Sequence, residues 1–577
     1  MVWALPLLPL IAGAAIWTTR PAWGAHGVVR ARERVVLAAT ATLTLGATLA
    51  VALWAAASHP DGAYGWGGGL ILTAEVDTAA SIMAVLVPTI ALAATVYAAV
   101  HEPRRGLTRL VVLLLAFAGA MELLVVAGDL LTLLIGWEVV GAISWALIGH
   151  DWYEPDKPAA AAHAFNATRF GDLGLFIAAA ATFAATGSLR YADVAALDGA
   201  ALHVAVAGIV LAAAAKSAQL PFAPWLFSAM GGPTPVSALL HAAAMVAAGA
   251  YLLARLEPAL SRAWWFGPAV LGIGLVTALG GGVVAALQPH AKKLLAASTS
   301  AQYGLMFVAV GAGSAAAGLA HLVAHAAFKA LLFLSAGVAI GAAGSQQLAE
   351  MRLGRSLPVV AVLTATGSLA LAAVPPLGAA FTKEAVVAAA GHRGLWLVLI
   401  VILAGAFSAF YAARFQLLAY GPTRGNGAPG DVDRPGWAET APIAYLALLT
   451  VALGVVWLPG AQRAAGDLLG GELPKGQTWE LALSLVAVAA GAYAAVVADR
   501  RGHLATLGTR RAADWFGLPA LVEGAVIRPT LVLCAALARF DEQVVDAGVR
   551  TAAAIARGFS RLASRFSERG VDGIIEA

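Results

Sequence analysis

The chain has 577 residues, of which 60% are hydrophobic and 12% charged, and its formal net charge is +4. Long apolar runs separated by short polar ones exclude an ordinary soluble globular protein and are typical of a protein embedded in a lipid bilayer. Because no compact block of Lys and Arg with interleaved aromatic residues occurs, we expect lipid and protein partners and no nucleic acid.

Transmembrane helices need about 20 mostly apolar residues, and on that measure the sequence predicts about fifteen spans in an all-α polytopic membrane protein. The stretch from Val2 to Trp17 is interpreted as the first span, because it lacks the basic start and the cleavage site of a signal peptide. The predicted cores are 2–18, 35–57, 78–100, 110–127, 130–149, 170–187, 203–227, 234–255, 266–288, 295–313, 318–342, 357–390, 395–420, 440–459 and 479–498.

Two predicted spans, 203–227 and 357–390, are too long for one crossing and contain internal prolines, which predicts discontinuous helices. Two such helices, separated by about 170 residues, are typical of a transporter built from two inverted repeats.

Positive charge gathers in the odd-numbered loops, which predicts that these loops are cytoplasmic and that the N-terminus is outside. The basic residues are Arg20, Arg30, Arg32 and Arg34 in the first loop, Arg104, Arg105 and Arg109 in the third, Lys292 and Lys293 in the ninth, and Arg352 and Arg355 in the eleventh. Arg255 and Arg262, in the eighth loop, are exceptions.

From about 527 to 566 the apolar residues recur at helical spacing, with arginines between them. This pattern predicts an amphipathic helix that lies along a membrane or protein surface on the cytoplasmic side; a basic tail without a specific partner is the alternative. We expect four parts: N-terminal transmembrane helices at 1–100, a proton-translocating core at 101–420, C-terminal transmembrane helices at 421–500 and the amphipathic segment at 501–577.

Ionisable residues inside the predicted spans point to function, because each one near the middle of a span costs about 2.5–3.5 kcal/mol on insertion scales. Glu138 lies in an otherwise apolar helix, with Asp129 near the preceding boundary. A simple hydrogen bond from Glu138 to a neighbouring helix is the alternative. Arg169 and Asp172 begin the next span, where they are expected to form a capping ion pair or to tune Glu138.

Lys216 is followed by Pro221 and Pro224, so the helix should break just after the lysine. The carbonyls freed by the break are expected to solvate the ammonium, and a lysine so placed can cycle between charged and neutral forms. A snorkelling lysine is the weaker interpretation. His241 lies inside the next span, where an imidazole can pass a proton at near-neutral pH.

His321, His325 and Lys329 are four residues apart, so they lie along one face of a helix over a rise of about 12 Å. Three ionisable groups on one stripe favour a proton relay over isolated core histidines. Lys383 and Glu384 follow Pro375 and repeat the design of the Lys216 region.

Other chemistries are not supported by the sequence, which has no GxSxG, Walker or HExxH motif. The single cysteine, Cys534, excludes an internal disulfide and a cysteine-ligated iron–sulfur cluster. We therefore expect no catalytic, cofactor-binding or metal-binding residue on this chain.

Several of these stretches together resemble the antiporter-like subunits of proton-pumping NADH:quinone oxidoreductase (complex I). The likeness covers about Ala74 to Tyr420 and is carried in order by GWEVVGAISWALIGH, KSAQLPFAPWLFSAMGGPTPVSALLHAAAMVAAGAYLLAR, LAASTSAQYGLMF, HLVAHAAFKALLFLSAG and FTKEAV. The C-terminal amphipathic segment looks like the beginning of the lateral helix of the L-type member.

The resemblance implies a role for each of these residues in proton transfer. It makes Glu138 and Lys216 the proton-coupling pair, His241, His321, His325 and Lys329 the central relay, and Lys383 the exit lysine. From the residues themselves we expect Glu384 beside Lys383 at the exit, and Asp129, Arg169 and Asp172 as auxiliary residues. The resemblance also implies that a redox module alters the Glu–Lys coupling, and that Lys216 releases its proton inward along the relay when Glu138 leaves it. The family's NADH, flavin, iron–sulfur clusters and quinone are expected in partner subunits, in a bacterial-type inner membrane.

The sequence departs from the family pattern at a few positions. His290 stands where an aspartate is usual, Ala297 replaces an aromatic residue, Glu384 replaces an aspartate, and the family's final anchoring span does not follow the amphipathic segment.

Three functions remain open: a complex I-type subunit, a membrane subunit of a related system, or a structural scaffold with static ion pairs. The related systems are an Mrp-type cation/proton antiporter, a membrane-bound hydrogenase and a DAB-type inorganic-carbon uptake complex.

Overall fold

The computed structural model of the chain describes residues 1–19, 28–422, 434–507, 510–566 and 570–577. Arg20, one of the basic residues expected in the first loop, lies outside the described residues. The chain divides into two compact units, Met1–Phe516 and Gly517–Ala577.

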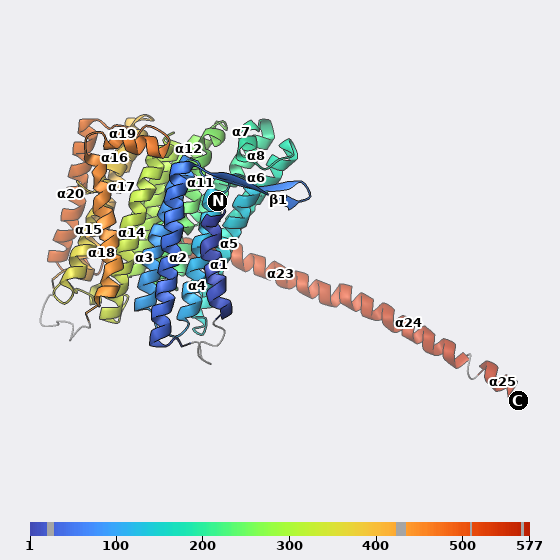
Figure 1. Ribbon diagram of the computed structural model, residues 1–577. Helices are drawn as coiled ribbons and strands as arrows, with labels where there is room; N and C mark the ends of the chain where they lie inside the picture. The colour runs from blue at the N-terminus through green and yellow to red at the C-terminus, as the bar shows by residue number, and fades with distance from the viewer. Residues whose placement is uncertain (20–27, 423–433, 508–509, 567–569) are drawn as a thin grey trace. The chain divides into compact units, whose positions relative to one another are not determined.

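The first unit is a bundle of apolar helices, most of them long and aligned side by side (Figure 1). α2 packs on α3, α12 on α13, α6 on α8, and α17 on α20. The helices are α1 (Ala4–Thr19), α2 (Ala31–Ser58), α3 (Thr78–His101), α4 (Leu107–Val126), α5 (Leu130–Ile148), α6 (Asp156–Thr186), α7 (Tyr191–Ala196), α8 (Gly199–Lys216), α9 (Trp225–Ala229), α10 (Thr234–Ala242), α11 (Met245–Leu260), α12 (Phe266–Leu287), α13 (Ala291–Gly311), α14 (Ala315–Ala343), α15 (Pro358–Leu371), α16 (Gly378–Gly391), α17 (Leu395–Tyr420), α18 (Trp437–Ala452), α19 (Ala461–Leu469), α20 (Thr478–Arg500) and α21 (Arg510–Ala513), with 3-10 turns at Leu348–Glu350, Leu453–Trp457 and Trp515–Gly517.

The expected all-α membrane fold is confirmed, since every predicted core overlaps at least one helix. Within the described residues, 13 helices are long and apolar enough to cross a membrane, and Ala4–Thr19 and Pro358–Leu371 are shorter apolar helices. The longest of the 13, Trp515–Phe566, includes the segment for which we predicted a surface helix. The count of fifteen spans, the inverted repeats and the four-part division stay predictions.

Both predicted helix breaks are present. α8 ends at Lys216, and the chain resumes a helix only at Trp225. α15 ends at Leu371 and α16 begins at Gly378. Pro375 has no N–H to donate to the carbonyl four residues earlier, so the carbonyl of Leu371 is left free for another donor.

A third break, between α10 and α11, was not predicted. The helical backbone stops at Ala242 and restarts at Met245, and Ala244 has φ −120° and ψ −105°. No proline or glycine lies at this point, so the sequence offers no local signal for it.

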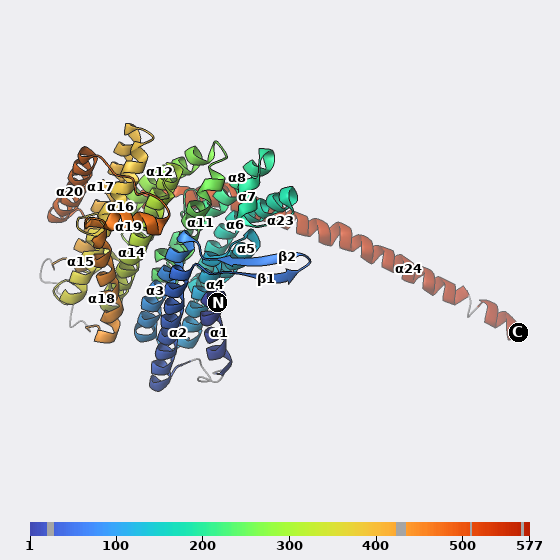
Figure 2. The same ribbon diagram turned by 45° about the horizontal axis from the view of Figure 1, so that its top comes forward.

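A β-hairpin between α2 and α3 was also missed. β1 (Asp61–Gly67) pairs antiparallel with β2 (Leu70–Glu75), with Asp61 opposite Glu75 (Figure 2). The turn uses Gly67, Gly68 and Gly69, whose φ values of 121°, 59° and 83° favour glycine. The run of three glycines between short apolar segments was the available signal.

Loops of equal parity meet on the same face of the bundle. Isolated backbone bridges join the first loop to the third, the second to the fourth, the fourth to the sixth, and the ninth to the eleventh, at Val28–Arg105, Ala74–Ala127, Asp129–Arg190 and His290–Gln347. The basic loops therefore share one face and the acidic hairpin lies on the opposite one.

The second unit is mainly one long helical segment. It comprises α22 (Leu518–Val522), α23 (Arg528–Phe540), α24 (Asp546–Phe566) and α25 (Asp572–Ile575), with π-helical turns at Glu523–Ile527 and Asp541–Val545. In α24, Phe559 and Phe566 lie on one face while Arg557 and Arg561 lie on another, as the predicted amphipathic pattern requires.

Close packing of α6 on α8 depends on glycine. A Cβ atom on Gly208 would lie 2.1 Å from the carbonyl oxygen of Gly174, and one on Gly174 would lie 2.5 Å from that of Gly208. Small residues let membrane helices approach backbone to backbone, and this contact sets the distance between Asp172 on α6 and Lys216 on α8.

We expect Gly208→Ala to push α6 away from α8 and to lower the free energy of unfolding by about 1–3 kcal/mol, the usual cost of overpacking. Gly272→Ala is the matched control, because no described atom lies within 4 Å of its added Cβ. Thermal unfolding of the full chain in detergent measures both. Equal midpoints for the two variants would contradict the packing argument.

Candidate functional site

The predicted site residues lie on helices that pack around α14 and α6, and most are buried. Lys216, His241, His321, His325 and Lys329 are each 0% exposed. Charged groups at such depth need partners from neighbouring helices.

Lys216 has Asp172 as its direct ionic partner, while its proton coupling to Glu138 stays a prediction. Its Nζ lies 3.1 Å from Asp172 Oδ2, and both side chains are buried. Glu138 instead forms an ion pair with Arg169. The physical reason is that α6 packs between α5 and α8. Arg169 of α6 therefore pairs with Glu138 of α5, and Asp172 of α6 pairs with Lys216 of α8. The alternative capping pair of Arg169 with Asp172 is replaced in the same way.

Trp137, which the sequence analysis did not single out, completes the surroundings of this ion pair. Its indole nitrogen donates to Asp172 Oδ1 at 2.5 Å, and its ring centroid lies 5.1 Å from Lys216 Nζ. Both oxygens of Asp172 are therefore engaged, and the ammonium gains a cation–π contact. Its position next to Glu138 in the sequence was the only signal.

His241 lies between two aromatic rings at the end of α10. Its ring centroid is 6.4 Å from that of Trp225 and 5.3 Å from that of Phe333 on α14. Neither ring nitrogen has a hydrogen-bond partner among the described residues. Trp225 also donates to the carbonyl of Ala215 at 2.9 Å, so it joins the end of α8 to His241.

His321, His325 and Lys329 share the continuous helix α14, but their partners differ. Lys329 Nζ donates to Ser298 Oγ at 2.6 Å. His325 packs edge-on against Tyr303, with centroids 5.0 Å apart. His321 binds two side chains, Gln302 and Thr382, each at 3.0 Å.

Lys383 is the lysine that a broken helix solvates. Its Nζ donates to the free carbonyl of Leu371 and to Ser408 Oγ, both at 2.6 Å. The carbonyl solvation expected at Lys216 is thus found here, while Lys216 has a carboxylate partner. Glu384 does not pair with Lys383, but both line a cavity of about 40 Å³ with Ser484, enough for a water molecule or two.

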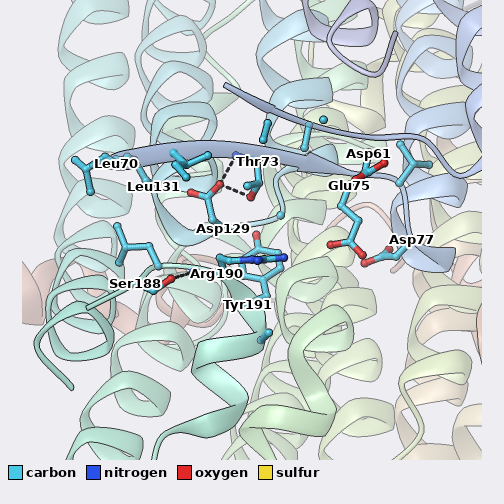
Figure 3. A pocket seen from close by; sticks show the side chains of 18 of the residues that line it. Asp61, Leu70, Thr73, Glu75, Asp77, Asp129, Leu131, Ser188, Arg190 and Tyr191 are labelled. Atoms are coloured by element: carbon cyan, nitrogen blue, oxygen red, sulfur yellow. Dashed lines mark hydrogen bonds between the residues drawn. The ribbon is translucent and has the colours of Figure 1, made fainter. Parts of the chain in front are cut away.

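Asp129 accepts hydrogen bonds that hold the backbone in place. It caps α5 by accepting from the Thr132 backbone N–H at 2.8 Å, and it accepts from the N–H and hydroxyl of Thr73 at 2.6 and 2.5 Å (Figure 3). These bonds fasten β2 to α5 beside a cavity of about 860 Å³ that Glu75 and Arg190 also line.

Glu122 is a buried carboxyl that sequence reasoning passed over. It is 0% exposed in the C-terminal half of α4, and neither of its oxygens has a hydrogen-bond partner among the described residues. The criterion applied to Glu138, an acidic residue inside an apolar span, would have found it.

Comparison with known proteins assigns the family. Residues 127–409 match the family described as NADH:quinone oxidoreductase/Mrp antiporter, transmembrane. NADH-quinone oxidoreductase subunit L of Mycobacterium tuberculosis (strain ATCC 25618 / H37Rv) is 36% identical over 475 residues, which cover 76% of this chain and 73% of that protein. The chain belongs to this family. For this antiporter-like subunit, subunit L of Campylobacter jejuni is a further relative, 34% identical over 397 residues that cover 67% of this chain and 66% of that one.

Solved structures agree with the fold of the antiporter-like subunit. A chain of the Mrp complex from Dietzia sp. DQ12-45-1b matches with a TM-score of 0.75 and 26% identity, over 94% of this chain and 63% of that one. A chain of the membrane-bound sulfane sulfur reductase, an archaeal respiratory membrane complex, matches with a TM-score of 0.69 over 84% of this chain and 99% of that one. At 19% identity, the second likeness concerns the fold alone.

His290, which departs from the family pattern, still caps its helix. It is the N-cap of α13, and its Nδ1 accepts from the backbone N–H of Lys293 at 3.4 Å. Burial, and after it the ammonium groups of Lys293 and Lys292, lowers the pKa of His290 to about 4. The neutral ring keeps the lone pair that the cap requires, a function an aspartate also performs.

This lowered pKa predicts a loss of stability in acid. Above the unfolded pKa of about 6.5 the ring is neutral in both states, and the stabilisation is present. Between pH 6.5 and 4 the unfolded state binds a proton that the folded state does not, so stability falls. We expect His290→Asn, which keeps an acceptor but does not titrate, to flatten the fall in unfolding temperature over this range. Burial also lowers the pKa of His150 to about 4. Its contribution to the loss of stability in acid is therefore the same in the wild type and in His290→Asn. An unchanged slope would contradict the assignment.

Proposed function

We propose that this chain is the proton-translocating membrane subunit of a complex I-type NADH:quinone oxidoreductase, driven by a redox module in other subunits. The observation that carries the proposal is the buried Lys216–Asp172 ion pair, from which buried titratable side chains continue across the bundle to Lys383. The subunit L relatives support the choice of complex. NADH, flavin, iron–sulfur clusters and quinone then belong to partner subunits, with this chain in the membrane arm.

In the proposed pathway the proton is held first at Lys216 and passes inward by way of His241 to the relay on α14. His241 faces α14 through Phe333, and Lys383 delivers the proton to the opposite end. Glu138 and Arg169 act on the first step, because they share α6 and its neighbour with the Lys216–Asp172 pair.

The proposed location is a bacterial inner membrane, with the basic odd-numbered loops in the cytoplasm and the acidic hairpin outside. In that orientation the C-terminal amphipathic helix begins on the cytoplasmic side.

A second candidate is the cation/proton antiporter subunit of an Mrp-type complex, which the fold match over 94% of the chain favours. Co-purification separates the two. Flavin and iron–sulfur subunits in the purified complex support the first function, whereas their absence beside other antiporter subunits supports the second.

We expect Lys216→Ala to abolish NADH-driven proton uptake in inverted membrane vesicles while the complex stays assembled, because the first buried proton carrier is lost. Lys157→Ala is the control, since the ion pairs that the described residues give Lys157, with Glu154 and Asp156, lie at the N-terminal end of α6. Acidification is followed with a pH-sensitive dye and assembly by native electrophoresis. Full pumping by assembled Lys216→Ala would favour a structural scaffold over a proton pathway.

The two ion pairs, Lys216–Asp172 and Arg169–Glu138, predict different effects for the two carboxylates. Asp172→Asn leaves the buried Lys216 ammonium unpaired and should destabilise the chain by about 3–5 kcal/mol. Glu138→Gln leaves only the partly exposed Arg169 unpaired and should lower pumping with a smaller loss of stability. Thermal unfolding and vesicle pumping, measured on both variants, test this order. A larger loss of stability in Glu138→Gln than in Asp172→Asn would indicate that Lys216 takes Glu138, and not Asp172, as its ionic partner.

A further inference from the structure

A buried hydrogen-bond network joins the relay histidine His321 to Lys383 through residues that have no assigned role. Gln302 on α13 and Ser408 and Tyr411 on α17 form it, and all three side chains are at most 1% exposed. The network lies where the proposed pathway must pass from α14 to the exit lysine, so its chemistry bears on that step.

The donors of the network fix the orientation of the Gln302 amide. Its nitrogen donates to the Tyr411 hydroxyl at 2.8 Å and approaches Ser408 Oγ at 3.3 Å. The amide oxygen therefore faces His321, and lies 3.0 Å from Nε2 of that ring. A carboxamide oxygen only accepts hydrogen bonds, so Nε2 of His321 must carry a proton.

The other nitrogen of His321 is then the one that takes up a proton. Nδ1 lies 3.0 Å from Thr382 Oγ1, and that hydroxyl also lies 3.2 Å from the carbonyl of Ala379. The hydroxyl donates to Nδ1 when the ring is neutral and turns to the carbonyl when Nδ1 is protonated. His321 thus keeps a partner in both states.

Ser408 accepts hydrogen bonds from both Lys383 and Tyr411, but it donates to neither of them. Lys383 donates to Ser408 Oγ at 2.6 Å, Tyr411 donates to it at 3.2 Å, and Ser408 itself donates to the carbonyl of Leu371 at 2.7 Å. No donor in this set points from Ser408 back to Gln302. The amide between His321 and Lys383 is not an acid or base at ordinary pH.

We propose that Gln302, held by Tyr411, is a positioning residue and proton barrier: it fixes His321 as the Nε2–H tautomer and prevents free proton transfer between His321 and Lys383. This proposal rests on the proposed function and deepens it. A pump needs such a barrier, because a continuous chain of exchangeable groups would let protons flow back through the subunit.

Gln302→Glu tests the barrier directly, since it replaces the amide with an isosteric group that can carry a proton. We expect vesicles with the assembled complex to dissipate an imposed pH gradient several-fold faster than wild type without substrate. Gln416→Glu is the matched control. Gln416 lies on α17, the helix of Ser408 and Tyr411, and its amide binds Ser368 and the carbonyl of Ala361 outside the network. Dissipation at the control rate would overturn the proposal.

Tyr411→Phe gives a second test that does not introduce a charge. Without the hydroxyl the amide can turn, so His321 should show a mixture of tautomers, read from the ¹⁵N shifts of histidine-labelled full-length protein with the signal assigned by its loss in His321→Gln. Tyr420→Phe is the control and should leave the tautomer unchanged. It removes a hydroxyl of α17 that donates to the carbonyl of Ser335 on α14, the helix of His321. A single Nε2–H tautomer in Tyr411→Phe would contradict the positioning role.

Lys216→Ala in the same vesicles separates the two levels of failure. Lost pumping in Lys216→Ala with no added leak in Gln302→Glu refutes the barrier and leaves the proposed function standing. Undiminished pumping in Lys216→Ala refutes the proposed function itself.

Discussion

The buried ion pair between Lys216 and Asp172 is the interaction on which the other polar groups of the bundle depend. An unpaired ammonium at this depth would cost several kcal/mol, so a second helix has to bring a carboxylate to it. α6 can do so because Gly208 of α8 meets it backbone to backbone. Once α6 is in place, Arg169 on the same helix takes Glu138 as its partner. Helix packing thus decides the pairing of four charged residues together.

At Lys383 a broken helix, and not a carboxylate, stabilises the buried ammonium. Pro375 deprives the carbonyl of Leu371 of its helical donor, and Lys383 takes that place at 2.6 Å. The two sites therefore solve one problem, a buried ammonium, by different means. A carboxylate supplies a full negative charge, while a carbonyl supplies a dipole that costs less to bury.

Features of this fold that depend on residues close together in the sequence could be predicted, and features that depend on contacts between distant helices could not. Helix spans depend on local apolar runs, and the breaks after Lys216 and Leu371 depend on prolines within a few residues, so the sequence was sufficient for both. The partner of Lys216 depends on which neighbour of α6 each side chain faces, and spacing along the chain does not contain that information. The break at Ala244 likewise has no local signal, because no proline or glycine lies at this point.

In the candidate site, too, some residues could be recognised from the sequence and others could not. Ionisable residues in apolar spans stand out by composition, and Glu122 stood out equally although it was passed over. The neutral members of the network, Gln302, Ser408 and Tyr411, do not stand out, because buried hydroxyls and amides are common in membrane helices. Only their convergence on His321 and Lys383 in three dimensions distinguishes them.

The three buried lysines of the proposed pathway, Lys216, Lys329 and Lys383, also differ in how readily they can give up a proton. Lys329 and Lys383 bind serine hydroxyls, and a hydroxyl can accept from an ammonium or, after rotating, donate to an amine. These two lysines therefore keep a hydrogen bond in both protonation states. Lys216 faces the carboxylate of Asp172, which can only accept, so the neutral amine would lose its ion pair. Release of the proton from Lys216 thus requires Asp172 to change its partner first, and the controlling step of the proposed pathway lies on α6.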